Sequence, residues 1–285
     1  AKQDPVQVFN LAIQNASRAA IDFLQSSGVT MKQLTSIVLF TFFVVAQKAD
    51  GQPLDAKAAP VVIELFTSEG CSSCPPADTY LAELARDSSL VVLAWHVDYW
   101  DGLGWRDPFS TKEATERQRC YARALESDQV YTPQLVIDGH DECVGSDREQ
   151  SSAAITAARK AQKAPVTIQT VEIKDGKVRA SIDIDGLHTP VDGDYFQTVV
   201  ALTEDGLSNK VTRGENSGRR LEHVAVVRAF KQRQVQTDTG YSGAFEFELD
   251  AGWNRSKLKI VAFVQKSRGM EIVGAASRAL AQEGK

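Results

Sequence analysis

The chain has 285 residues, of which 43% are hydrophobic and 24% charged, enough for one large globular domain or two smaller ones. Its formal net charge of -5 at pH 7 argues against a general nucleic-acid-binding protein. The sequence contains no glycine-rich nucleotide motif and no long low-complexity run. We therefore expect a globular protein without a nucleic-acid partner.

A short basic start and an apolar stretch follow Met31. Lys32 precedes the apolar residues 37–46, which end in small side chains. This pattern predicts a signal peptide over residues 31–49. The stretch is shorter than the ~20 residues that a membrane-spanning helix needs. We therefore expect a secreted or periplasmic protein with no membrane span in its mature chain; the alternatives are a buried helix or a membrane anchor.

Met31 is one of only two methionines, and the sequence begins with alanine. We interpret residues 1–30 as a non-native or upstream extension. The alternative is a genuine amphipathic helix, because the apolar residues of this segment fall near helical spacing. Residues 50–59 have the composition of a linker.

Residues 60–163 alternate between strand and helix patterns. Predicted strands span residues 61–67, 90–97, 134–138 and 142–144, and predicted helices span residues 77–85, 112–127 and 146–163. Pro76 suits the first turn of its helix, and Ser146 with Glu149 forms a capping box. The order predicts a parallel strand–helix–strand unit followed by an antiparallel hairpin, hence an α/β domain with a central mixed sheet flanked by helices.

Residues 164–285 show strict alternation of apolar and polar side chains instead. Predicted strands span residues 166–173, 177–184, 196–202, 224–230, 244–249 and 258–264. Asp-Gly pairs such as Asp175-Gly176 separate some of them, as in tight hairpins. This half is predicted to be an all-β, sandwich-like domain.

Basic residues are concentrated in one part of this second half. They are Arg213, Arg219, Arg220, Arg228, Lys231 and Arg233. Acidic residues interrupt the run, which favours a solvated face over an anion-binding surface.

Cys71 and Cys74 lie between the first predicted strand and the helix that opens at Pro76. Two intervening residues allow a disulfide to close and reopen with little backbone motion, and a helix N-terminus favours a thiolate. We predict that Cys71 is the more exposed, nucleophilic cysteine and that Cys74 resolves the mixed disulfide. The disulfide itself would take the place of a bound cofactor. The alternative is a purely structural disulfide.

Glu64 is the one charged residue in an apolar strand. A carboxyl buried there would have a raised pKa, so Glu64 is a candidate proton acceptor for the cysteine pair. The alternative is that Glu64 faces a polar edge or pairs with an arginine.

The remaining cysteines are Cys120 and Cys143. An even cysteine count in an exported protein predicts a second disulfide between them. The alternative is two free structural thiols.

The loop at residues 98–111 follows the second predicted strand and is rich in aromatic and acidic side chains. Because binding sites lie at the ends of parallel strands, Trp100 is a candidate for gripping a substrate beside Cys71. The alternative is a loop that folds over the core, with Trp100 and Trp105 as its lids.

Four motifs together resemble a known family. They are residues 66–76 (FTSEGCSSCPP), 96–101 (HVDYWD), 131–133 (YTP) and 214–219 (GENSGR). They resemble the secreted bacterial proteins grouped as domain of unknown function 1223, over residues 60 to about 280. The cysteine pair and the Thr-Pro entry to the third strand also resemble the thioredoxin-like superfamily.

The superfamily resemblance implies a cis Thr132–Pro133 bond opposite the cysteine pair. It also implies that Thr132 and Pro133 present backbone groups to an extended substrate, so that protein thiols or disulfides are the partners. We therefore predict an exported thiol–disulfide oxidoreductase. Two alternatives remain: a copper- or zinc-binding chaperone using Cys71, Cys74 and a histidine such as His96, or a non-catalytic interaction module.

Overall fold

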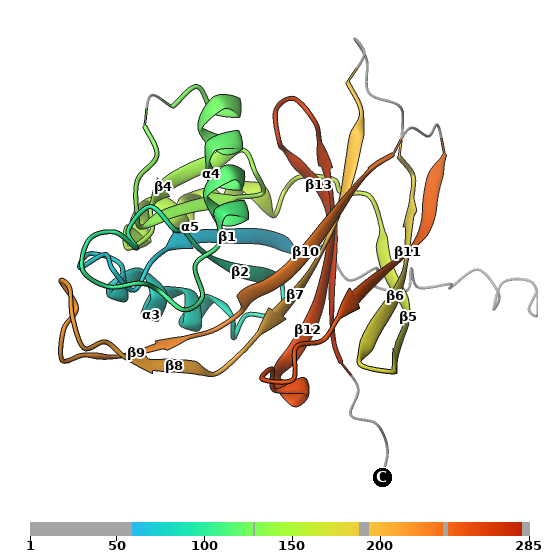
Figure 1. Cartoon of the computed structure of the whole chain (residues 1–285). Helices are drawn as coiled ribbons and strands as arrows, with labels where there is room; N and C mark the ends of the chain where they lie inside the picture. Colours follow the sequence, from blue (N-terminus) through green and yellow to red (C-terminus); the bar gives the residue numbers. More distant parts are fainter. Residues whose placement is uncertain (1–58, 128, 188–193, 236–238, 281–285) are drawn as a thin grey trace, which may run out of the picture. The chain divides into compact units, whose positions relative to one another are not determined.

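The computed structural model describes residues 59–127, 129–187, 194–235 and 239–280 (Figure 1). The predicted extension, the signal peptide and all but the last residue of the predicted linker lie outside these residues. Within the described part the chain forms three sheets and three α-helices.

The largest sheet has eight strands in the order β13-β12-β7-β10-β2-β1-β3-β4. Their bounds are β1 Val61–Thr67, β2 Leu90–His96, β3 Gln134–Ile137, β4 Asp141–Val144, β7 Phe196–Glu204, β10 Val226–Val235, β12 Leu258–Lys266 and β13 Ile272–Ala279. β1 pairs in parallel with β2 and antiparallel with β3, and β3 pairs antiparallel with β4. Because β1 and β2 are buried on both faces, their sequences are continuous apolar runs rather than alternating ones.

Two smaller sheets complete the described structure. One contains β5 (Val166–Lys174), β6 (Lys177–Asp185) and β11 (Gly240–Glu248), and the other contains β8 (Leu207–Lys210) and β9 (Arg220–His223). The three-stranded sheet packs its alternating apolar side chains against those of β7 and β12. The two-stranded sheet lies at the opposite end of the molecule, below α3 (Figure 1).

Helices cover both faces of the N-terminal half of the large sheet. They are α3 (Pro75–Leu84), α4 (Lys112–Ala124) and α5 (Arg148–Ala158). α3 and α5 lie on the face where Leu65 packs with Leu81 and Ile155, and α4 lies on the other, where Phe66 meets Tyr121. No helix of the described residues is long and apolar enough to span a bilayer.

The start of α5 differs by one residue from the prediction. Asp147, rather than Ser146, is the N-cap, and its side chain accepts a hydrogen bond from the Gln150 amide at 3.0 Å. An aspartate caps a helix as well as a serine does, and the sequence offers both.

The predicted fold class is wrong. The described chain is mostly β, and the sheet that carries the cysteine pair is not a self-contained α/β thioredoxin-like sheet followed by a separate sandwich. Instead β10 pairs with β2 in parallel at Val226 and Ala94, and β7, β12 and β13 extend the same sheet. The alternation of side chains predicts where strands occur but not which strands pair. An unpaired β2 edge would be costly, and β10 covers it.

A buried charge network joins α4 to the sheet. Arg117 donates from Nε and Nη2 to the two carboxylate oxygens of Glu64, at 2.6 and 2.9 Å, and Trp95 Nε1 donates to the same carboxylate at 2.8 Å. Tyr121 donates a further hydrogen bond to Glu64. Glu64 is fully buried, and its pairing with an arginine is the alternative that the sequence left open.

We expect Glu64→Gln to lower the free energy of unfolding by about 3–5 kcal/mol, because it leaves Arg117 buried without a counter-ion. The double substitution Glu64→Leu with Arg117→Met should recover most of this loss, since an apolar pair needs no compensating charge. Denaturant unfolding of the three proteins measures both effects. A single variant as stable as the wild type would contradict this account of the network.

Candidate functional site

Cys71 and Cys74 form a disulfide at the start of α3. Their Cα atoms lie 5.5 Å apart, and Cys74 is the N-cap residue of the helix. The Cys74 carbonyl accepts hydrogen bonds from the amides of Ala77 and Asp78, at 2.9 and 3.1 Å. The pair therefore lies where the first turn of a helix presents its positive end.

The residues predicted to bind a substrate surround Cys71. Its Sγ lies 3.8 Å from the Thr132 carbonyl oxygen and 3.3 Å from Ser73 Oγ. Trp100 Nε1 donates to Thr132 Oγ1 at 2.8 Å, and the Thr132–Pro133 peptide bond is cis, as expected. The structure thus brings Cys71, Thr132, Pro133 and Trp100 together.

Neither cysteine of the pair is exposed. Both have a relative exposure of 0%, so the prediction that Cys71 is accessible is wrong for the disulfide form. Beside the cysteine turn lies a segment that we call the β8–β9 arm (residues 207–223), whose two strands were not predicted from the sequence.

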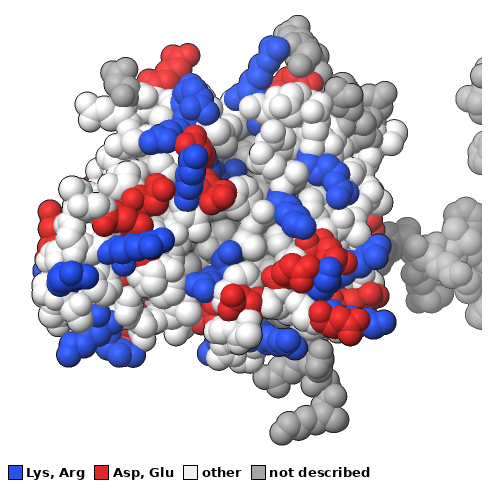
Figure 2. Space-filling view, in the orientation of Figure 1, with Lys and Arg blue, Asp and Glu red and all other residues white. Residues whose placement is uncertain are grey.

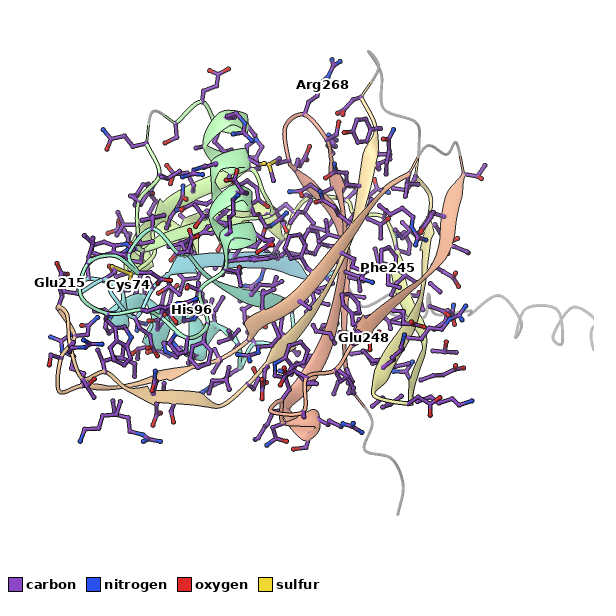
Figure 3. All side chains as sticks on the ribbon, in the orientation of Figure 1. Cys74, His96, Glu215, Phe245, Glu248 and Arg268 are labelled. Atoms are coloured by element: carbon purple, nitrogen blue, oxygen red, sulfur yellow. A yellow bond between two sulfur atoms is a disulfide. The ribbon has the colours of Figure 1, made fainter. Side chains whose placement is uncertain are left out.

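The loop of the β8–β9 arm is bonded to the cysteine turn. Asn216 Nδ2 donates to the carbonyl oxygens of Glu69 and Cys71, both at 2.9 Å. The carboxylate of Glu215 accepts a hydrogen bond from the Ser72 amide at 3.0 Å. Glu215 and Cys74 accordingly lie close together at one end of the molecule (Figure 3).

Glycine at position 214 allows this approach. Gly214 has a φ of 74°, and a Cβ there would lie 3.0 Å from the Cβ of Trp105. Any other residue would be strained and crowded, so the glycine lets the arm pack against the loop at residues 98–111.

Behind the cysteine turn lies a cluster of five buried titratable side chains. We call it the His–carboxylate cluster, and its members are Glu69, Asp78, His96, Asp107 and His223. His223 Nε2 lies 3.1 Å from the Glu69 carboxylate, and His96 Nδ1 lies 2.7 Å from that of Asp107. The two imidazole rings meet edge to face with 4.8 Å between their centroids.

Asp78 is the member of this cluster that lies on the same helix as Cys74. It lies four residues after Cys74, so both side chains project from the same face of α3. One carboxylate oxygen accepts a hydrogen bond from Thr67 Oγ1 at 2.9 Å, and the other lies 4.0 Å from His223 Nδ1. Nothing in the local sequence distinguishes Asp78, because an acidic residue in a first helical turn is common on dipole grounds alone.

Burial and charge shift the titration of these groups in different directions. Burial raises the pKa of the Asp78 carboxyl, against the opposing effects of His223 and His96. Burial alone would lower the pKa of His96, but the charge and hydrogen bond of Asp107, together with the charges of Asp78 and Glu69, outweigh burial and raise the pKa. The pKa of Asp107 is lowered, because its bonds and charge interaction with His96 exceed the effect of its burial.

Two imidazole nitrogens in the cluster are buried and have no hydrogen-bond partner among the described residues. They are His96 Nε2 and His223 Nδ1.

Glu64, the proton acceptor predicted from the sequence, lies elsewhere. Its side chain belongs to the α4 face of β1, whereas α3 and Asp78 lie on the other face. Nor does His96 join the cysteines, since its Nδ1 is bonded to Asp107. In residues 59–280, gaps excepted, no group of three or more His, Cys, Asp or Glu side chains could hold a metal ion.

The predicted second disulfide is wrong. Cys120 and Cys143 are free thiols, and they lie on opposite faces of the sheet. Cys120 packs on α4 against the core that contains Phe66, whereas Cys143 belongs to the core that contains Leu65. Burial raises the pKa of the Cys143 thiol to about 11, so it is unreactive near neutral pH.

With this geometry established, comparison with known proteins shows a family. A family model described as "Protein of unknown function (DUF1223)" matches residues 62–265. The chain belongs to the DUF1223 family. No curated protein matches the chain.

Two solved structures resemble this DUF1223 protein. An Agrobacterium tumefaciens protein is 30% identical, with a TM-score of 0.61 over 80% of this chain and 97% of the other. HBP35 of Porphyromonas gingivalis is 15% identical, with a TM-score of 0.60 over 78% of this chain and 76% of the other, a likeness of fold alone. The family description names no reaction, so function must be argued from the site.

The raised pKa of His96 predicts a specific dependence of stability on pH. The folded state holds this proton more tightly than the unfolded chain, whose histidine pKa is about 6.5. The contribution to stability is therefore complete below that value and is lost as pH rises through the folded pKa. We expect the stability difference between wild type and His96→Gln to shrink as pH rises above about 6.5.

Urea unfolding between about pH 5.5 and pH 9 measures this difference. His140→Gln is the control, because His140 is exposed and its variant should follow the wild type at every pH. A difference between wild type and His96→Gln that stays constant across the range would contradict the assignment.

Proposed function

We propose that this DUF1223 protein is a thiol–disulfide oxidoreductase that exchanges its Cys71–Cys74 disulfide with the thiols of a partner protein. The observation that carries the proposal is a bonded Cys-x-x-Cys pair at a helix N-terminus, with the buried Asp78 carboxyl one helical turn away. A disulfide closing so short a loop removes little entropy from the unfolded chain. Its position therefore favours a chemical role over a structural one.

Exchange begins when a partner thiolate attacks Cys71 Sγ. A new sulfur–sulfur bond forms to the partner, the Cys71–Cys74 bond breaks, and its electron pair leaves on Cys74. A second partner thiolate then attacks the partner's sulfur in the mixed disulfide and releases Cys71 as thiolate. The partner loses two electrons and two protons, and Cys71 and Cys74 become thiols. Run in reverse, the same steps reduce a partner disulfide.

The start of α3 supplies the electrostatics for the leaving group. Cys74 is the N-cap residue, where unpaired amides and the helix dipole favour negative charge. The Asp78 carboxyl, with its raised pKa, can protonate the departing Cys74 sulfur. In the reverse direction the Asp78 carboxylate takes the proton from the Cys74 thiol as that sulfur attacks the mixed disulfide.

Thr132, Pro133 and Trp100 form the substrate side in this proposal. The Thr132 carbonyl borders Cys71 Sγ, and the Trp100 indole fixes the Thr132 side chain. An extended partner segment would lie along Thr132 and Pro133, with its cysteine directed at Cys71. We place the reaction in an exported compartment on the basis of the apolar stretch at residues 37–46. No observation at this site favours the copper or zinc alternative.

Cys74→Ser should trap partners on Cys71, because the resolving thiol is missing and the mixed disulfide persists. The expected result is a set of adducts that disappear on reduction, detected on non-reducing gels and located at Cys71 by mass spectrometry. The double variant Cys71→Ser with Cys74→Ser should give none. Cys120→Ser added to the trap should leave the adducts unchanged, because that thiol is remote from the exchange. Absence of adducts, together with no redox exchange by the wild type, would refute the proposed function.

Asp78→Asn should slow the attack of Cys74 on a mixed disulfide about 100-fold near pH 6, because a positioned base is lost. The deficit should close as pH approaches the ordinary thiol pKa of about 8.5, where solvent removes the proton. Stopped-flow exchange with a disulfide-linked peptide across this range measures the profile.

Asparagine keeps the size of Asp78 and still accepts the bond from Thr67, so folding should survive. Glu83→Gln, an exposed change on the same helix, is the matched control. Superimposable pH profiles for wild type and Asp78→Asn would remove Asp78 from the mechanism and leave the cysteines untouched.

A further inference from the structure

The β8–β9 arm carries four exposed basic side chains beside the disulfide. They are Lys210, Arg213, Arg219 and Arg220. Within the part of the chain that the structure describes, none of them is paired with a carboxylate, and their side-chain bonds go to neutral groups, Asn216 and Ser208. Lysine and arginine side chains gather over this arm in the lower left of Figure 2.

The other half of the basic run behaves differently. Arg228 lies 3.4 Å from the Glu204 carboxylate, Lys231 lies over the ring of Phe247, and Arg233 lies over another ring of the three-stranded sheet. These β10 cations are used in packing. The structure thus divides the single basic run of the sequence into a packed half and an unpaired half.

The unpaired half has an energetic cost. Lys210 and Arg220 are directly opposite in the β8–β9 register, and like charges at opposed positions destabilise a hairpin. A carboxylate at either position would remove the repulsion. Acidic residues are in excess in this chain, whose net charge is -5, yet both positions carry a cation. Folding therefore does not account for this pair, whereas binding an anion would relieve it.

Successive side chains along the two strands of the arm point alternately inward and outward, so contacts with the site and exposed charges lie on different faces. The inner face presents Asn209 and His223 to Glu69, at 3.1 Å in each case. The outer face presents Lys210 and Arg220 to solvent, because successive strand residues point to opposite sides. The exposed charges therefore lie directly over a segment that contacts the catalytic turn.

A carboxylate is already accommodated next to the cysteines. Glu215 accepts hydrogen bonds from the side chain and the backbone amide of Ser72, and these bonds lower the pKa of its carboxyl. The arm loop thus shows that the exposed rim of the cysteine turn binds a carboxylate.

We propose that the outer face of the β8–β9 arm docks an acidic, Asp/Glu-rich segment of the redox partner, next to the partner's reactive cysteine. This inference rests on the proposed function for the nature of the occupant. A protein segment fits better than nucleic acid, because exchange requires a thiol or disulfide in the ligand and nucleic acid supplies neither.

A binding experiment tests the docking separately from the chemistry. The probe is a fluorescein-labelled peptide with a central serine flanked by three glutamates on each side, titrated by anisotropy at low and moderate salt. Lys210→Glu with Arg213→Glu should weaken binding about tenfold, and added salt should weaken wild-type binding. Lys160→Glu with Lys174→Glu makes the same change in net charge on exposed residues outside the arm, and should change binding less than about twofold.

Three results would overturn the docking proposal. They are no binding to the wild type, equal losses in the arm and control variants, and equally tight binding of a single-stranded DNA of matching charge. Thermal unfolding of both double variants establishes that they fold, which Lys210→Glu favours by facing Arg220.

Replacing the central serine by cysteine separates this proposal from the proposed function. Acidic cysteine peptides should exchange with the Cys71–Cys74 disulfide faster than lysine-flanked ones, and the arm variant should abolish the preference. Binding without any exchange would refute the oxidoreductase and retain the docking. Exchange at a rate independent of the arm charges would refute the docking and retain the oxidoreductase.

Discussion

The fully buried carboxylate of Glu69 ties together the segments that enclose the disulfide. Burying a charge is costly unless polar groups surround it, and here Trp105 supplies one such group from the loop at residues 98–111, and Asn209 and His223 supply two from the β8–β9 arm. The Glu69 backbone is bonded as well, its amide to Asp107 and its carbonyl to Asn216. The hydrogen bonds of this one residue therefore hold the loop at residues 98–111 and the β8–β9 arm against the cysteine turn.

This arrangement bonds the β8–β9 arm to the backbone of the cysteine turn. Asn216 binds the carbonyls of both Glu69 and Cys71, so the arm cannot leave the cysteines without also losing a partner of the Glu69 turn. In the disulfide form both cysteines are buried, so attack by a thiolate requires a neighbouring segment to move. A partner that docks on the arm, as we propose, would contact a segment that is bonded directly to the cysteine turn.

The sequence predicts local features of this protein better than their assembly. The strand at residues 61–67 matches β1 residue for residue, because a short apolar run bounded by polar residues has few other uses in a sheet. β8 and β9 were missed because their mixed polar residues carry no strong strand signal, and the loop between them is long. The fold class was wrong because β2 takes its neighbour β10 from far along the chain. A cysteine count cannot show that Cys120 and Cys143 lie on opposite sheet faces. The cysteine pair and Thr132–Pro133 are predictable because each is a local motif of the sequence. His223 and Asp107 are not, because they reach the site only through tertiary structure.

The contrast between two buried carboxylates is the reason that we propose Asp78 on α3, rather than Glu64 on β1, as the acid–base group. Glu64 is held by two nitrogens of the Arg117 guanidinium, a permanent cation that needs this carboxylate as its buried counter-ion. Asp78 has no such partner among the described residues: its carboxylate accepts a hydrogen bond from Thr67 and lies 4.0 Å from His223 Nδ1, and burial raises its pKa. The Asp78 carboxyl can therefore gain a proton without leaving a permanent cation buried alone. Burial alone marked Glu64 as a candidate, but it is the nature of the counter-charge that decides whether a buried carboxyl can exchange protons.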